Sequence, residues 1–267
     1  MTPPSFLDPL APLQWPTLVL VTTRVLGMVL TAPLWSMIIV PARVRAALVI
    51  VVALLLLPAA PARPLPEGTL ALPGLVGVEL LLGIATGLVA SLFMHGVAIA
   101  GDVMGVQTGL SIATTYDPTT EATATEIAQV ASYFALALYV TLGGPLFLLQ
   151  ALGDSLRAIP PGSAVESVTG ARSLVQQGGA VFGTAVSLAA PVMVTLFLTN
   201  VALAILTRAV PQISAFMVAF PITIGLGVFS LGASLPAVGG LVRRWAESVP
   251  GVAAAALAAF MPAGGGP

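Results

Sequence analysis

The sequence contains no cysteine and no lysine, and it has one histidine and few charged residues. The absence of cysteine excludes disulfides, thiolate metal sites and a cysteine nucleophile. A zinc site draws several ligands from His, Cys and carboxylates, so the single His95 argues against a metalloenzyme. Only 7% of the 267 residues are charged, whereas soluble domains average about 25%. These charges are too few to cover a water-facing surface of this size.

Signatures of enzymes and of nucleic-acid binding are also missing. The chain has no Gly-x-Ser-x-Gly, no His-Glu-x-x-His and no Walker-type phosphate loop. The net charge of −1 gives no electrostatic basis for binding nucleic acid. We therefore predict a protein without catalytic residues, metal or cofactor.

Long apolar runs take the place of charged surface. No ionisable side chain occurs between Arg172 and Arg208 or between Arg208 and Arg243, and the stretch from Glu126 to Asp154 is uncharged at neutral pH. A bilayer core needs roughly 20 apolar helical residues to cross it. Several such runs in one chain predict a polytopic membrane protein that contacts lipid.

The apolar runs predict an all-α fold of about six long helices that form hairpins. Strands are excluded because lipid tolerates only helices and closed barrels, and these runs are too long for barrel strands. We expect one integral domain over 1–262 and a disordered tail over 263–267, with the first apolar segment retained in the mature protein. The expected segments are Leu13–Leu34, Val44–Leu57, Leu70–Ala100, Ile127–Leu152, Val175–Leu206 and Pro211–Val242, followed by a weak helix over Val249–Phe260.

The connections include a glycine-rich stretch and a polar loop. The glycine-rich stretch covers Gly101–Pro118, and the polar loop covers Asp154–Arg172 with Pro160-Pro161-Gly162 as its turn.

The membrane topology does not follow from the arginines. Arg43 with Arg45 and Arg243 with Arg244 are the strongest positive-inside markers, yet six alternating spans place the two pairs on opposite sides. Either one segment does not span, or the helices are held within a protein assembly. The second segment is the weakest span by length.

Ionisable groups at membrane depth are costly and indicate function by default. Arg24, Glu79, His95 and Asp102 are such groups. An arginine near the middle of an apolar helix is expected to pair with an acid or with backbone carbonyls of a neighbour.

Small residues recur every four positions between Glu79 and His95. Gly83, Gly87 and Ser91 would lie on one helix stripe, where another helix can approach closely. The favoured interpretation is a packing seam. The alternative, a proton relay, would place Glu79 and His95 about 24 Å apart, at roughly 1.5 Å per residue.

A second four-residue row is formed by Gly101, Gly105 and Gly109. A glycine inside a helix costs about 1 kcal/mol relative to alanine, so this row predicts a segment that breaks from helix. Irregular backbone at membrane depth must be buried in protein or line a cavity. The row is equally compatible with a close helix contact, at Gly101 and Gly105, followed by a turn at Asp117-Pro118.

Three separated motifs resemble one known family. They are GDVMGVQTGLSIATTYDP over Gly101–Pro118, LTRAVPQISAFMVAFPITIGLG over Leu206–Gly227, and RVLGMVLTAPLWSMIIVPARVR over Arg24–Arg45. Together they resemble the FliR family of flagellar biosynthetic proteins, the T-type subunits of type III secretion export gates. The matching positions include Arg24, Pro33, Pro41, Arg43, Gln107, Pro118, Arg208, Pro211, Gln212, Phe216, Phe220 and Pro221.

The resemblance implies a subunit of a protein-export channel in the bacterial inner membrane, at the flagellar basal body. Its partners would be the P-type and Q-type export-gate subunits, together with the B- and A-type subunits. Its substrates would be unfolded flagellar proteins. One loop of such a subunit plugs the channel, which favours the cavity-lining interpretation here. The implied plug consists of Gly109, Leu110, Ser111, Ile112, Ala113, Thr114, Thr115, Tyr116 and Asp117.

The chain also departs from the family pattern. Thr108 stands where many relatives have methionine, and Tyr116 is the one aromatic residue of the loop. An injectisome export subunit, a small-solute secondary transporter and an intramembrane enzyme remain as alternatives. Gln107, Gly109 and Asp117-Pro118 favour the flagellar branch.

Overall fold

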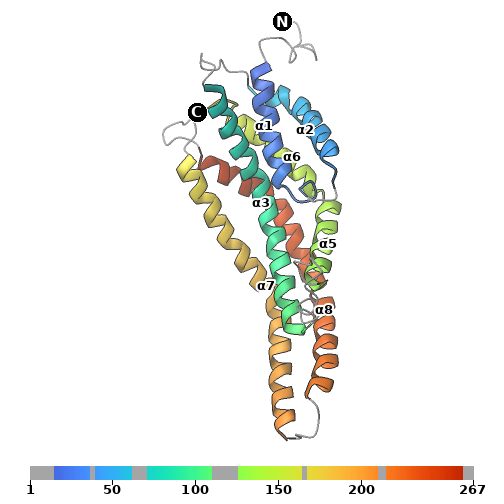
Figure 1. The fold of residues 1–267 in the computed structure, drawn as a ribbon. Helices are drawn as coiled ribbons and strands as arrows, with labels where there is room; N and C mark the ends of the chain where they lie inside the picture. Colours follow the sequence, from blue (N-terminus) through green and yellow to red (C-terminus); the bar gives the residue numbers. More distant parts are fainter. Residues whose placement is uncertain are drawn as a thin grey trace. The chain divides into compact units, whose positions relative to one another are not determined.

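A computed structural model describes residues 15–36, 40–61, 71–109, 126–163, 167–209 and 215–260. All regular structure in these ranges is helical, which confirms the predicted all-α class (Figure 1). The helices are α1 (Trp15–Thr31), α2 (Ala42–Leu56), the 3₁₀ segment η2 (Leu57–Ala59), α3 (Ala71–Thr108), α5 (Glu126–Thr141), α6 (Gly144–Ala158), α7 (Ser167–Ala209) and α8 (Ala215–Ala258).

Within the described ranges, four helical segments are long and apolar enough to cross a membrane: Ala42–Ala59, Leu72–Thr108, Phe182–Ala209 and Met217–Pro236. The pair α5 and α6 would make a fifth if it acts as one broken span. The prediction that the second segment is the weakest span is wrong. The 3₁₀ turn extends that segment to 18 residues, whereas α1, with 17, is the shorter apolar helix.

The fourth apolar run forms two helices instead of the single helix expected over Ile127–Leu152. A break of two residues separates α5, which ends at Thr141, from α6, which begins at Gly144. Gly143 lies between them with φ +79°, a left-handed conformation that glycine adopts without steric cost. Pro145 then occupies the first turn of α6, where its missing N–H is tolerated. Uniform hydropathy therefore conceals a break caused by the backbone.

The glycine-rich stretch remains helical further than expected. Helix α3 includes Gly101 and Gly105 and ends at Thr108, so the predicted break within this row is wrong up to that residue. Gly101 and Gly105 are buried, and packing against neighbouring helices offsets the low helix propensity of glycine. Gly109 is the first residue beyond the helix and has φ +82°.

Two other boundaries differ from the expected segments. The polar loop is shorter than Asp154–Arg172, because α6 continues to Ala158 and α7 begins at Ser167. The separate helix expected over Val249–Phe260 is the last part of the continuous helix α8. Pro160, Pro161 and Gly162 do form the predicted turn, in which Ser163 N donates to Pro160 O.

The chain divides into two compact units. Unit 1 comprises residues 1–92, 143–177 and 246–267, and unit 2 comprises residues 93–142 and 178–245. In unit 1, α1 lies beside α2, and the start of α3 packs on the end of α8 through Leu82, Leu257 and Phe260 (Figure 1).

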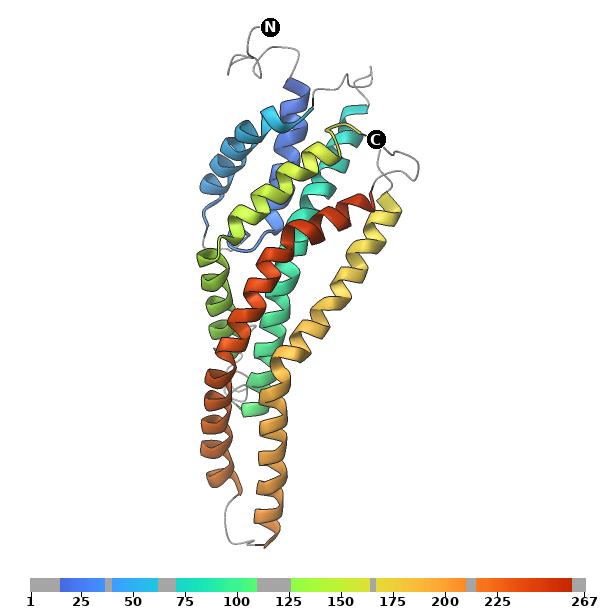
Figure 2. The same ribbon diagram turned by 180° about the vertical axis from the view of Figure 1, so that it is seen from behind.

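Unit 2 is built from the later part of α3, from α5, and from long parts of α7 and α8, which run side by side (Figure 2). Its core includes an aromatic cluster. The rings of Phe93 and Trp245 stack with centroids 4.5 Å apart, and the ring of Tyr139 lies 5.2 Å from that of Trp245. The outer faces of α7 and α8 expose large apolar side chains such as Phe197 and Phe229. Such a surface suits lipid or partner helices better than water.

Candidate functional site

A buried ion pair lies inside unit 1. Arg24 of α1 is 0% exposed and Glu79 of α3 is 1% exposed. The Nε atom of Arg24 donates to Oε2 of Glu79. An isolated charge in this environment costs several kcal/mol, so each group requires the other. The expectation that Arg24 pairs with an acid or with backbone carbonyls of a neighbouring helix is confirmed.

The pair also contacts two segments, α6 and the turn after it, that the sequence did not identify as partners of Arg24 or Glu79. Arg24 Nη1 donates to the Ser155 carbonyl oxygen on α6, at 3.0 Å. The second carboxylate oxygen of Glu79 accepts from Gly162 N in the turn after α6, also at 3.0 Å. Arg24 Nη2 has no hydrogen-bond partner within the described residues. The ion pair therefore fixes α1, α3, α6 and the turn after α6 to one another.

The glycines of the four-residue stripe lie where α3 meets α1. A Cβ atom on Gly83 would overlap the carbonyl oxygen of Arg24, and one on Gly87 would lie 2.6 Å from the carbonyl oxygen of Met28. The contact is reciprocal, because a Cβ atom on Gly27 of α1 would lie 2.5 Å from Leu80 O. The two backbones therefore touch directly. Gly27 escaped the sequence analysis because it stands alone, without a repeating partner on its own helix.

The ends of the stripe behave differently from its centre. The side chain of Ser91 is buried and its hydroxyl donates to Leu88 O within the same helix, at 3.0 Å. His95 is exposed. Glu79 is engaged by Arg24 and Gly162. This arrangement gives no support to a proton relay along the stripe.

In unit 2 the C-terminal end of α3 is packed tightly against α8. Thr108 is 1% exposed, and its hydroxyl donates to Gly105 O at 2.9 Å. A Cβ atom on Gly227 of α8 would overlap the Thr108 methyl group. The hydroxyl of Thr223, one turn earlier in α8, donates to Ala219 O of its own helix at 2.9 Å and lies 3.4 Å from the Thr108 carbonyl oxygen. The helix thus ends at a close contact with α8, directly before Gly109.

The start of α5 is packed against α3. A Cβ atom on Gly101 would overlap the Cα atom of Ala128, the third residue of α5. Gly101 and Thr108 are seven residues apart on α3, about 10 Å at 1.5 Å per residue. The chain therefore leaves α3 at Thr108, and at Ala128 it packs against α3 again about two helical turns earlier.

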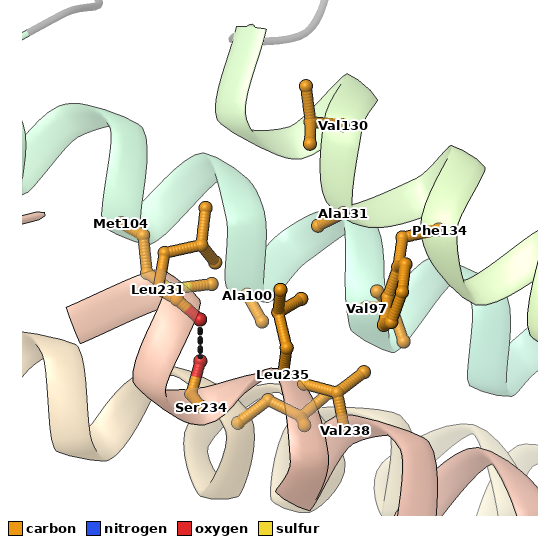
Figure 3. A pocket seen from close by; sticks show the side chains of 11 residues that line it. Val97, Ala100, Met104, Val130, Ala131, Phe134, Leu231, Ser234, Leu235 and Val238 are labelled. Carbon is orange, nitrogen blue, oxygen red and sulfur yellow. Dashed lines mark hydrogen bonds between the residues drawn. The ribbon is translucent and has the colours of Figure 1, made fainter. Parts of the chain in front are cut away.

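An apolar cavity of about 100 Å³ lies among α3, α5, α7 and α8 of unit 2 (Figure 3). Ser234 is the one polar side chain among the described residues that line it, and its hydroxyl already donates to Leu231 O. Phe134 and Val130 of α5 form part of the wall. A cavity with no available polar group offers nothing to bind an ion or to activate water.

The remaining motif residues fall into three groups. Pro33 is buried in the turn after α1, Pro41 precedes α2 as its N-cap, and Gln107 is half-buried in the last turn of α3. Arg43, Arg208 and Pro221 are exposed on their helices. The predicted plug from Leu110 to Asp117 lies outside the described residues, as do Pro118, Pro211 and Gln212 and the side chain of Phe220.

No group of three or more His, Cys, Asp or Glu side chains that could hold a metal occurs in the described ranges. The fold, with its apolar helices and its buried ion pair, defines a multi-pass membrane protein. The model of the family described as bacterial export proteins, family 1, matches residues 15–249, and the chain belongs to this family.

Curated relatives agree with that family. The flagellar biosynthetic protein FliR of Escherichia coli (strain K12) is 32% identical over 224 residues, which cover 84% of each chain. The FliR of Caulobacter vibrioides is 32% identical over 230 residues, 85% of this chain and 90% of the relative. The FliR of Bacillus subtilis is 31% identical over 169 residues, 62% of this chain and 65% of the relative. These matches confirm the resemblance carried by the three motifs. They favour flagellar protein export over the injectisome and transporter alternatives.

Proposed function

We propose that this chain is a non-enzymatic subunit of the flagellar type III protein export gate in the bacterial inner membrane, where it helps to form and to plug the channel for unfolded flagellar proteins. The family match over residues 15–249 carries the proposal. The apolar outer faces of α7 and α8 suit a chain that packs among other membrane helices. Its partners are P-type and Q-type export-gate subunits, together with A- and B-type subunits.

The proposed plug is the segment from Gly109 to Asp117. Helix α3 ends at Thr108, and Gly109 turns the chain away with a positive φ. Leu110, Ile112 and Tyr116 are the large apolar or aromatic residues of this segment and would supply the sealing surface. An ion that meets such a surface must lose water without gaining a polar partner, which blocks its passage.

Deletion of Gly109–Tyr116 tests the plug directly. We expect the deletion to leave the assembled gate intact and to make the membrane leaky to small ions. Conductance of the purified gate in planar bilayers measures the leak. A second variant retains the length of the segment but replaces Leu110, Ile112 and Tyr116 with serine. Its matched control replaces Thr114 and Thr115 with serine and is expected to remain tight. An unchanged conductance in both the deletion and the triple-serine variant would refute the plug assignment.

A further inference from the structure

The end of α3 lies in close contact with α8 at Thr108. The side chain of Thr108 is almost completely buried, and its methyl group occupies the space that a side chain on Gly227 would need. One turn earlier, the Thr223 hydroxyl lies 3.4 Å from the carbonyl oxygen of Thr108. Two residues of α8, one turn apart, therefore lie against the last residue of α3. We name this set, Thr108, Gly227 and Thr223, the Thr108 contact.

The nearby glycines of α8 show that the close approach is confined to the Thr108 contact. A Cβ atom on Gly225 or on Gly232 would meet nothing within 4 Å. A requirement for glycine thus exists at position 227 and not at these two neighbours. Gly227 is needed because the Thr108 methyl group approaches the backbone of α8.

We propose that the Thr108 contact is the positioning element of the plug: α8 holds the end of α3, and so sets the place from which the segment beginning at Gly109 enters the channel. The inference rests on the proposed function. Gly109 follows Thr108 without an intervening residue, so a displacement of Thr108 is passed on to it directly. On the other side of the segment, Ala128 is fixed against Gly101. The Thr108 contact is the place where α8 touches the residue that directly precedes Gly109.

The substitution Gly227→Ala tests the proposal, because it places a methyl group against the Thr108 methyl group. We expect the variant chain to co-purify with the P- and Q-type subunits and the ion conductance of the gate to rise at least threefold. The substitution Thr108→Ser removes the opposing methyl group and keeps the hydroxyl that donates to Gly105. The double variant should therefore return to the conductance of the wild type. Gly225→Ala, on the same helix, is the matched control and should not change it.

The proposal is overturned if Gly227→Ala assembles and conducts like the wild type, or if the double variant is as leaky as the single one. Where Gly227→Ala fails to assemble, Thr108→Ser alone provides the decision, because it removes the methyl group that contacts Gly227 without adding bulk. A rise in conductance supports the proposal, and an unchanged conductance overturns it. Deletion of Gly109–Tyr116 distinguishes failure of the plug assignment from failure of the positioning role of the Thr108 contact. If that deletion leaks and the α8 variants do not, the positioning role fails while the plug stands; if the deletion does not leak, the plug itself fails.

Discussion

Replacement of Glu79 by leucine should destabilise the protein more than most substitutions of similar size. Glu79 balances the charge of Arg24, which is completely buried. In the variant, Arg24 keeps its hydrogen bond to Ser155 O but loses its counter-ion, and Gly162 N loses its acceptor. Removing one partner of a buried ion pair costs about 3–5 kcal/mol, because the other charge remains buried without compensation.

This cost can be converted into a melting temperature. For chains of about 150–250 residues, 1 kcal/mol shifts Tm by roughly 2–4 °C. The substitution Glu79→Leu should thus lower Tm by about 6–20 °C. The double variant Arg24→Met with Glu79→Leu removes both charges and fills the space with apolar atoms. Such replacements are often neutral or stabilising, so the double variant should recover most of the loss.

Thermal unfolding of the detergent-extracted protein, followed by size-exclusion chromatography after heating, measures both variants against the wild type. We expect the effects of the substitutions at positions 24 and 79 on Tm to be strongly non-additive. This expectation is refuted if Glu79→Leu lowers Tm by less than about 2 °C. It is equally refuted if the double variant is no more stable than the single one, because the cost would then not arise from an unpaired Arg24.

Two further substitutions test the packing of each unit by the same measurement. Gly83→Ala should lower Tm because its methyl group would overlap the Arg24 carbonyl oxygen, at a typical cost of about 1–3 kcal/mol, whereas Gly74→Ala on the same helix meets nothing within 4 Å and should raise Tm. Equal effects at the two glycines would contradict the direct contact between α1 and α3. Tyr139→Phe should raise Tm, because the buried Tyr139 hydroxyl has no partner within the described residues and such a group costs about 1–3 kcal/mol. A clear loss of stability in that variant would mean that the hydroxyl has a partner.

Hydropathy sufficed to predict the helical class, because lipid leaves few alternatives to a helix for an apolar run of this length. Hydropathy failed to predict where a helix ends when the backbone conformation, and not the side chains, determines the end. The break between α5 and α6 depends on the left-handed Gly143 followed by Pro145, and both residues lie within an otherwise uniform apolar run. The Gly-Gly-Pro sequence was the available signal for that break.

The glycine row at the end of α3 shows the opposite error. Helix propensity predicted a break, whereas Gly101 is retained in the helix because Ala128 packs against its backbone. The cost of about 1 kcal/mol for a glycine in a helix is small beside the packing that its missing side chain allows. Propensity alone could not reveal which neighbour uses that space.

The residues of the candidate site were predictable one by one but not as contacts. The cost of a buried charge indicated that Arg24 needs a partner, but nothing local identifies Glu79, which is 55 residues away, or Ser155, which is 131 residues away. The contact between Thr108 and Gly227 likewise joins residues that are far apart in the sequence. Such pairings depend on the order in which the helices pack, which a single sequence does not encode in any short pattern.

The central claim is that this chain functions as a subunit of a flagellar export gate. Tagged protein, expressed at its native level and extracted in detergent, tests it most directly when the co-purifying proteins are identified by mass spectrometry. We expect recovery of the P- and Q-type subunits of the flagellar export apparatus. Recovery of the chain alone, monodisperse and stable, would contradict it.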